Sequence, residues 1–185
     1  MKNKQHSVIY LTIILFIGIF FSACSKDDRE YRVDGYIDFS IEPETNPSNG
    51  LFDLRAYVDD SHIRDMNGNW LDPYYINSWS FTDEWAEITN MRIYSPVPAY
   101  ILWFDVEISG VGTYQYQGPE IQLLGEGDPF FIDDLDFQRF MRQATDLIIR
   151  NGGVYVRVLG ETNIKGTREP LYFDFFNSME FYVSR

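Results

Sequence analysis

Thiol and imidazole groups are scarce in this chain of 185 residues, which has one cysteine, Cys24, and two histidines, His6 and His62. A single cysteine excludes an intrachain disulfide and a multi-cysteine zinc site. A Ser-His-Asp or Cys-His catalytic system would depend on His62, and no nucleophile motif accompanies that residue. The sequence therefore predicts a protein that is not an enzyme.

Basic residues are also few. Lysine and arginine number 15 against 28 acidic residues, which gives a net charge of −13. Phosphate backbones and anionic headgroups bind to basic surfaces. We therefore expect no nucleic-acid partner and no peripheral binding to anionic lipid. Apolar residues make up 45% of the chain, which is typical of a folded protein, and the length suits one domain.

Residues 1–23 have the composition of a secretory signal peptide. Lys2 and Lys4 precede an uncharged run from Val8 to Phe21. As a helix this run would span about 21 Å, short of the ~30 Å hydrocarbon core of a bilayer. A basic start, a short apolar run and small residues behind it are typical of a cleaved leader. An uncleaved membrane anchor is the alternative.

The residues behind the apolar run, Phe21-Ser22-Ala23-Cys24, resemble the lipobox of bacterial lipoproteins, with phenylalanine in place of the usual leucine. The resemblance implies cleavage before Cys24 and attachment of diacylglyceryl, with palmitate among the acyl groups. Ser25-Lys26-Asp27-Asp28 is similar to the acidic export tag of Bacteroidetes-type surface lipoproteins. That resemblance implies a protein anchored in the outer membrane and facing the cell exterior. A solvated tether on a periplasm-facing lipoprotein is the alternative.

After a polar tether at residues 24–30, residues 31–185 are predicted to form a single β-sandwich domain. Apolar and polar residues alternate with the period of half-buried strands. The alternating segments are 31–41, 51–58, 88–94, 99–109, 111–117, 121–124, 154–161 and 171–183. In the segment 99–109 the alternation predicts one face made of Tyr100, Leu102, Phe104, Val106 and Ile108.

One segment, residues 133–150, has helical periodicity instead. Its apolar residues recur on one face: Phe137, Phe140, Met141, Ala144, Leu147 and Ile148. Asp133, Asp134 and Asp136 suit a helix N-terminus, and Gly152 suits its end. The rhythm of the whole domain is similar to small β-sandwich lipoproteins of gut Bacteroidetes, several of them immunoglobulin-like. We therefore expect an all-β, mainly antiparallel, immunoglobulin-like β-sandwich with one α-helix.

Aromatic residues are concentrated between positions 70 and 85. The candidate ligand-binding residues there are Trp70, Asp72, Tyr74, Tyr75, Trp79 and Trp85. Exposed indole and phenol rings stack on sugar rings, and carboxylates accept hydrogen bonds from sugar hydroxyls. The segment is therefore a candidate glycan-binding site. The alternative is that these rings close one end of the sandwich, because aromatic side chains commonly dominate protein cores.

Oxygen ligands alternate at Asp65, Asn67 and Asn69, as they do in calcium-binding loops. Gly68 comes too early for an EF-hand, and no glutamate stands at the closing position. A tight turn built on Asn67-Gly68 accounts for the same residues without a metal. We expect no cofactor, and calcium is the one metal that the sequence leaves open.

The sequence thus predicts a non-catalytic binding or accessory module at the cell surface, with glycan as the first candidate ligand. The alternative is a structural subunit of a fimbria or an outer-membrane complex, whose partner would be another surface-assembly protein. A carboxylate-dependent hydrolase is a third possibility, because glycoside hydrolysis needs two acids about 5–9.5 Å apart in a cleft.

Overall fold

The fold is known from a computed structural model that describes residues 29–41, 49–82, 86–92, 98–123, 130–165 and 172–184. The predicted signal peptide, Cys24 and Trp85 lie outside these ranges. Of the predicted tether, Arg29 and Glu30 are described, and both are exposed.

The first of two sheets has β1 and β11 at its centre and the strand order β3-β1-β11-β5-β9. Its strands are β1 (Tyr31–Ile41), β3 (Ile63–Asp65), β4 (Ile76–Phe81), β5 (Ala86–Arg92), β9 (Phe130–Ile132) and β11 (Tyr172–Val183). β11 pairs with β5 through its first half and with β4 through its second half. Both strands therefore lie along the edge of β11 that β1 does not occupy.

The second sheet has the order β2-β10-β6-β7, and β8 also pairs with β6. Its strands are β2 (Leu51–Asp59), β6 (Ala99–Ile108), β7 (Gly112–Gln115), β8 (Ile121–Leu123) and β10 (Gly153–Thr162). Every strand pair in the described part of the chain is antiparallel. The all-β, two-sheet architecture is therefore confirmed, whereas immunoglobulin-like connectivity is not confirmed and stays a prediction.

The core lies between the two sheets, where the inner faces are apolar as the alternation predicts. β1 buries Ile37, Phe39 and Ile41, and Phe39 stacks on Phe175 of β11 with ring centroids 4.9 Å apart. On the facing sheet, β10 buries Val154, Val156 and Val158. Burial of these large side chains is the main source of stability for a fold without a disulfide.

The predicted face of β6 is wrong in its first half. Glu161 of β10 pairs with Trp103, and Thr162 pairs with Ile101, so Leu102 is an extra residue between them. This β-bulge shifts the alternation by one position. Ala99 and Ile101 are buried in place of Tyr100 and Leu102, and the expected face resumes at Phe104.

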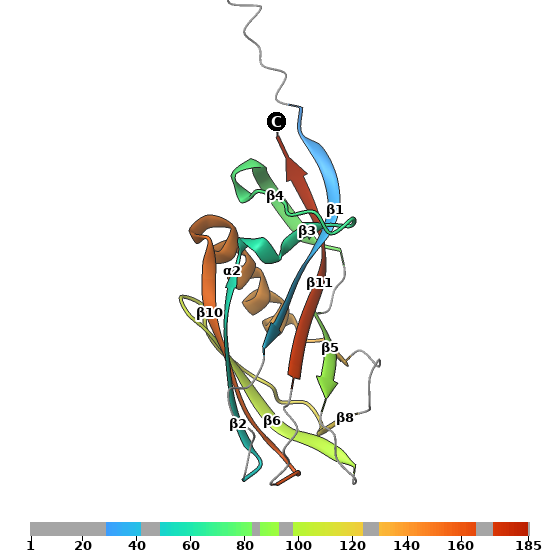
Figure 1. The fold of residues 1–185 in the computed structure, drawn as a ribbon, viewed down its shortest axis with the longest axis vertical. Helices are drawn as coiled ribbons and strands as arrows, with labels where there is room; N and C mark the ends of the chain where they lie inside the picture. Colours follow the sequence, from blue (N-terminus) through green and yellow to red (C-terminus); the bar gives the residue numbers. More distant parts are fainter. Residues whose placement is uncertain are drawn as a thin grey trace, which may run out of the picture.

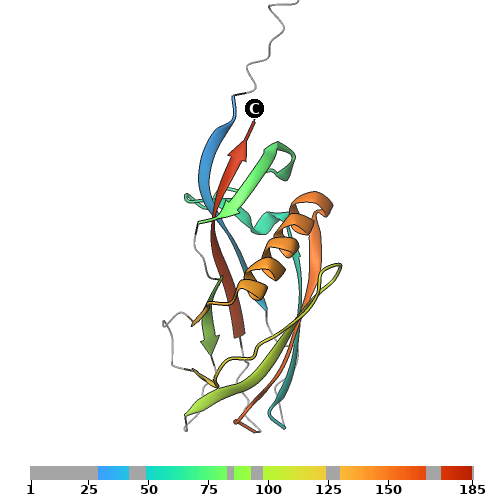
Figure 2. The same cartoon turned by 180° about the vertical axis from the view of Figure 1, so that it is seen from behind.

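The predicted helix is α2 (Leu135–Asn151), one turn or less from the expected bounds. The Asp134 carboxylate accepts a hydrogen bond from the backbone N–H of Asp136 at 2.8 Å, and Gly152 ends the helix with a φ of 80°. Figure 2 shows α2 lying obliquely between the sheets, and it contacts β5, β7 and β10. Its apolar face joins the core through Phe137, Phe140, Met141, Ala144 and Ile148.

One end of the molecule brings together the beginning of β1, the end of β11 and β4 (Figure 1). Tyr31 pairs with Val183, so the first residue of β1 lies beside the last residue of β11. The described end of the tether emerges at this same end. The aromatic segment of the sequence also lies here, because it leads into β4.

Candidate functional site

The Asp65 carboxylate organises the turn that precedes the aromatic segment. One oxygen accepts hydrogen bonds from the backbone N–H groups of Asn67 and Asn69, at 2.9 and 2.8 Å. The other accepts from the side-chain amide of Asn69 at 2.9 Å. Gly68 adopts a φ of 80°, which a residue with a side chain rarely adopts. The sequence Asp-Met-Asn-Gly-Asn therefore folds as a tight turn.

This turn contains all three residues that the sequence offers as calcium ligands. The hydrogen bond from the Asn69 side chain is the largest of several that lower the pKa of Asp65. These donors direct the positive ends of N–H dipoles at the carboxylate, where a cation would otherwise sit. Within the described ranges, no three His, Cys, Asp or Glu side chains are grouped as metal ligands. Calcium binding stays a prediction.

Three aromatic residues that follow the turn are exposed. Trp70 is 51% exposed, Tyr74 86% and Tyr75 46%. The Trp70 indole N–H donates to the carbonyl oxygen of Asp60 at 3.0 Å, which fixes the orientation of the ring. Asp72 caps the short 3-10 helix Pro73–Tyr75 by accepting from the Tyr74 N–H at 3.0 Å. The Trp70 ring is therefore both solvent-accessible and held in place.

An open groove of about 560 Å³ lies beside Trp70. It is lined by Tyr31 and Val33 of β1, by Val183 and Ser184 at the end of β11, and by Asp65, Trp70, Leu71, Asp72 and Tyr75. A lining that is mainly apolar and aromatic, with a few polar groups, is typical of small-molecule sites. The groove is the candidate ligand site of this chain.

The candidate ligand-binding residues divide between the groove and the packing of the domain. Trp70, Asp72 and Tyr75 line the groove. Tyr74 does not, but its ring lies edge-on to that of Tyr75 with centroids 5.1 Å apart. Trp79 lies in β4 and packs against the core, with its indole N–H donating to Asp146 of α2 at 3.0 Å. Trp85 is outside the described residues.

The sequence did not single out the groove residues that come from β1 and β11. Tyr31, Val33 and Val183 have the ordinary pattern of strand residues, and only the pairing of Tyr31 with Val183 brings them beside Trp70. No motif in the sequence marks Leu71 or Ser184 as a binding residue.

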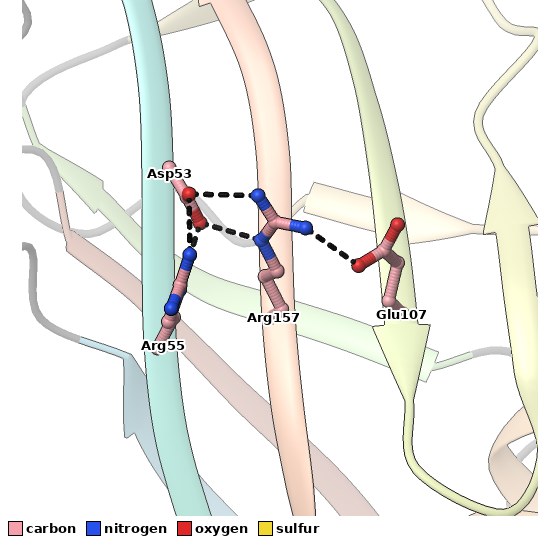
Figure 3. A network of polar contacts seen from close by, with 4 residues as sticks. All are labelled: Asp53, Arg55, Glu107 and Arg157. Atoms are coloured by element: carbon pink, nitrogen blue, oxygen red, sulfur yellow. Dashed lines mark hydrogen bonds and ion pairs between the residues drawn. The ribbon is translucent and has the colours of Figure 1, made fainter.

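Two acidic side chains away from the groove, Asp53 and Glu107, are held by structural contacts. On the outer face of the second sheet, Arg157 binds Asp53 at 2.7 and 2.8 Å and Glu107 at 3.1 Å, joining three strands (Figure 3). Hydrogen bonds from Arg157 and then Arg55 hold the pKa of Asp53 well below its usual range. Glu107 lies on the outward face of β6.

The Tyr114 hydroxyl donates a hydrogen bond to Asp134 at 2.7 Å in a second cavity, of about 470 Å³. That bond and the backbone N–H of Asp136 lower the pKa of Asp134, whereas burial raises the pKa of Tyr114. The Asp134 carboxylate is therefore stabilised in its ionised form, as suits a helix cap.

Comparisons of the chain with models of protein families, with curated proteins and with solved structures find no match. Among the described residues, no helix is both long and apolar enough to cross a membrane. The function proposed below therefore rests on the geometry of the groove.

Proposed function

We propose that this protein is a lipid-anchored, non-catalytic binding module of the cell surface that holds carbohydrate in the groove beside Trp70. The observation that carries the proposal is the arrangement of Trp70 and Tyr75 around one open groove with Asp65 and Asp72. Aromatic rings provide flat apolar faces, and carboxylates provide acceptors. A sugar ring presents the complement, with C–H groups on its faces and hydroxyls at its edge.

Preorganisation of the groove supports the proposal. The Trp70 ring is fixed through Asp60, and the Asp72 carboxylate is fixed through the Tyr74 N–H. The backbone N–H of Ser184 donates to the carbonyl of Tyr75 at 3.0 Å, which attaches the aromatic segment to the end of β11. Rigid side chains lose little conformational entropy when a ligand binds, so more of the contact energy becomes affinity.

An anchor at Cys24 would set the position of the groove relative to the membrane. Residues 24–30 would extend over at most about 25 Å. Tyr31, the first residue of β1, lines the groove, so the groove lies at the end of the domain where β1 begins. The proposed binding site would therefore face the membrane, within reach of glycans that coat the cell.

The anchor is tested by replacing Cys24 with serine in the cell and following incorporation of a labelled fatty acid. We expect label on the natural chain and none on the Cys24→Ser variant. Surface display is tested separately by antibody binding to intact cells. An alanine variant of Lys26, Asp27 and Asp28 that stays lipidated should lose the antibody signal; equal labelling of both would argue against an export tag.

Carbohydrate binding is tested by titrating the protein with a panel of oligosaccharides. Trp70→Ala and Tyr75→Ala should each weaken the binding of any saccharide that the natural chain binds. Tyr155→Ala is the matched control, because Tyr155 is 69% exposed on the outer face of the second sheet and does not line the groove. Equal loss in all three variants would contradict the assignment of the groove.

A structural role in a surface assembly is the second candidate. Among the described strands, β2 pairs with β10 alone, so one edge of this nine-residue strand has no strand partner there. Subunits can join through such edges by strand addition. Sedimentation over a range of concentrations tests this: reversible association would support the candidate, and a monomer throughout would count against it.

A further inference from the structure

A third cavity, of about 320 Å³, lies between the beginning of β4 and the second half of α2. Asn77 and Trp79 line it from β4, and Arg142, Asp146 and Arg150 line it from α2. We call it the arginine pocket. It adjoins the groove beside Trp70, because the Ser184 hydroxyl of the groove donates to the Asn77 side-chain oxygen at 3.2 Å.

The two guanidinium groups of the arginine pocket have no carboxylate partner among the described residues. Arg142 lies over the rings of Trp79 and Phe81, at 5.3 and 5.5 Å from their centroids, and Arg150 is exposed. By contrast, Arg32, Arg139 and Arg157 each form ion pairs. Arg142 and Arg150, one helical turn on either side of Asp146, thus lack an ion pair in the described part of a chain with 28 acidic residues.

The side chains that line the pocket carry a net positive charge, unlike the whole protein. Asp146 contributes one negative charge, and its carboxylate accepts the hydrogen bond from the Trp79 indole. Arg142 and Arg150 leave a net charge of +1 among the lining side chains. Charges farther away than the Debye length, about 8 Å at physiological ionic strength, are largely screened. The Glu30 carboxylate accepts a hydrogen bond from the Asn77 side-chain amide at 3.2 Å and adds a negative charge on the β4 side. A bound anion would therefore depend on the two arginines of α2.

We infer that the arginine pocket binds the carboxylate of an acidic sugar, within the same saccharide that occupies the groove; this inference rests on the proposed function. A guanidinium group presents N–H donors in a planar fork that matches a carboxylate. The cation–π contacts restrain Arg142 before the ligand arrives. Ile76, Trp79 and Ile149 supply apolar surface for the body of the sugar ring.

The test is calorimetric titration of the protein with trigalacturonate and with the same trisaccharide after reduction of its carboxyl groups to alcohols. Arg150→Ala should weaken trigalacturonate binding about tenfold or more, because a charge-assisted hydrogen bond is lost. Arg142→Lys should weaken it too, since the amine keeps the charge but loses the fork. Arg139→Ala is the matched control, because Arg139 is exposed on α2 and pairs with Asp136 outside the pocket.

The results separate the pocket from the groove. If both arginine variants bind trigalacturonate as tightly as Arg139→Ala, or if the acidic and reduced trisaccharides bind equally, the inference is overturned. If Trp70→Ala abolishes binding of both trisaccharides while the arginine variants do not, the groove stands and the pocket fails. If Trp70→Ala binds trigalacturonate as the natural chain does, and the arginine variants bind it more weakly, the groove fails and the pocket stands. Melting temperatures of all variants identify any loss of folding.

Discussion

The indole N–H of Trp79 donates a hydrogen bond to the carboxylate of Asp146 at 3.0 Å, which joins β4 to α2 across 67 residues of sequence. Arg142, one helical turn before Asp146, lies over the same ring. Trp79 therefore belongs to the packing between the first sheet and the helix. Trp70, only nine positions earlier, is half exposed and lines the groove.

This difference predicts that two tryptophan substitutions will lower the stability of the protein by different amounts. Trp79→Ala should lower the free energy of unfolding by roughly 2–4 kcal/mol, because it removes a large packed ring and a hydrogen bond. Trp70→Ala should lower it by less than about 1 kcal/mol, because the ring is half exposed. Urea unfolding measures both values. Trp79→Phe, which keeps most of the ring, should lie between the two variants; a Trp70→Ala variant as unstable as Trp79→Ala would contradict the division.

The buried side chain of Asn177 is a site where a substitution should stabilise the protein. It lies on the inner face of β11, is 3% exposed, and neither its side-chain oxygen nor its nitrogen has a hydrogen-bond partner in the described structure. A buried polar group without a partner costs about 1–3 kcal/mol. Asn177→Val should therefore raise the free energy of unfolding, and the β-branched side chain suits a strand.

Thr145 provides the control for this prediction. It is also buried, but its hydroxyl donates to the carbonyl of Met141 at 3.0 Å. Thr145→Val should have little effect or destabilise by up to about 1 kcal/mol, because a satisfied hydrogen bond is lost. A destabilised Asn177→Val variant would mean that the Asn177 amide has a partner, such as an internal water molecule.

The lowered pKa of Asp134 indicates that the folded protein loses part of its stability in acid. Its pKa is lowered in the folded state, first by the Tyr114 hydroxyl and then by the N–H of Asp136. A group whose pKa falls on folding stabilises the fold above its unfolded pKa, about 3.9 for aspartate. That stabilisation disappears as the pH falls through the folded pKa. The free energy of unfolding, measured against pH, should fall less in acid for Asp134→Asn than for the natural chain. Parallel curves of free energy against pH would contradict the linkage.

The Asp65 turn predicts an effect on both stability and binding. Asp65→Ala removes a carboxylate that accepts three N–H donors, and should lower the melting temperature. Because the turn leads directly to Trp70, the same variant should weaken saccharide binding. If hydrogen bonds alone hold the turn, the melting temperature should be the same in calcium and in a chelator. A rise in calcium that Asp65→Ala abolishes would instead establish the metal site.

Local patterns in the sequence predicted most of the architecture. β1 has the expected bounds, and its buried face follows the alternation from Val33 to Ile41. The apolar stripe and capping residues of α2 also specify the helix, because they depend on neighbours in the chain. The bulge at Leu102 could not be predicted, because it arises from the register between β6 and β10.

The candidate site was predicted only in part for the same physical reason. The density of rings near Trp70 indicated a binding segment, but ring density alone does not distinguish an exposed Trp70 from a packed Trp79. That difference depends on Asp146 and Arg142, which are far away in the sequence. The other side of the groove comes from Tyr31 and Val183, which strand pairing brings together.

The central claim, that saccharide binds beside Trp70, is tested most directly by following the indole N–H signals of the tryptophans by NMR during an oligosaccharide titration. Three of these N–H groups have different hydrogen-bond acceptors: Asp60 for Trp70, Asp146 for Trp79 and Glu161 for Trp103. Trp70→Ala and Trp103→Phe variants assign the signals. We predict that a saccharide shifts the Trp70 signal in a saturable manner and leaves that of Trp103 unchanged. A shift of the Trp103 signal alone, or no shift with any saccharide tested, would contradict the account.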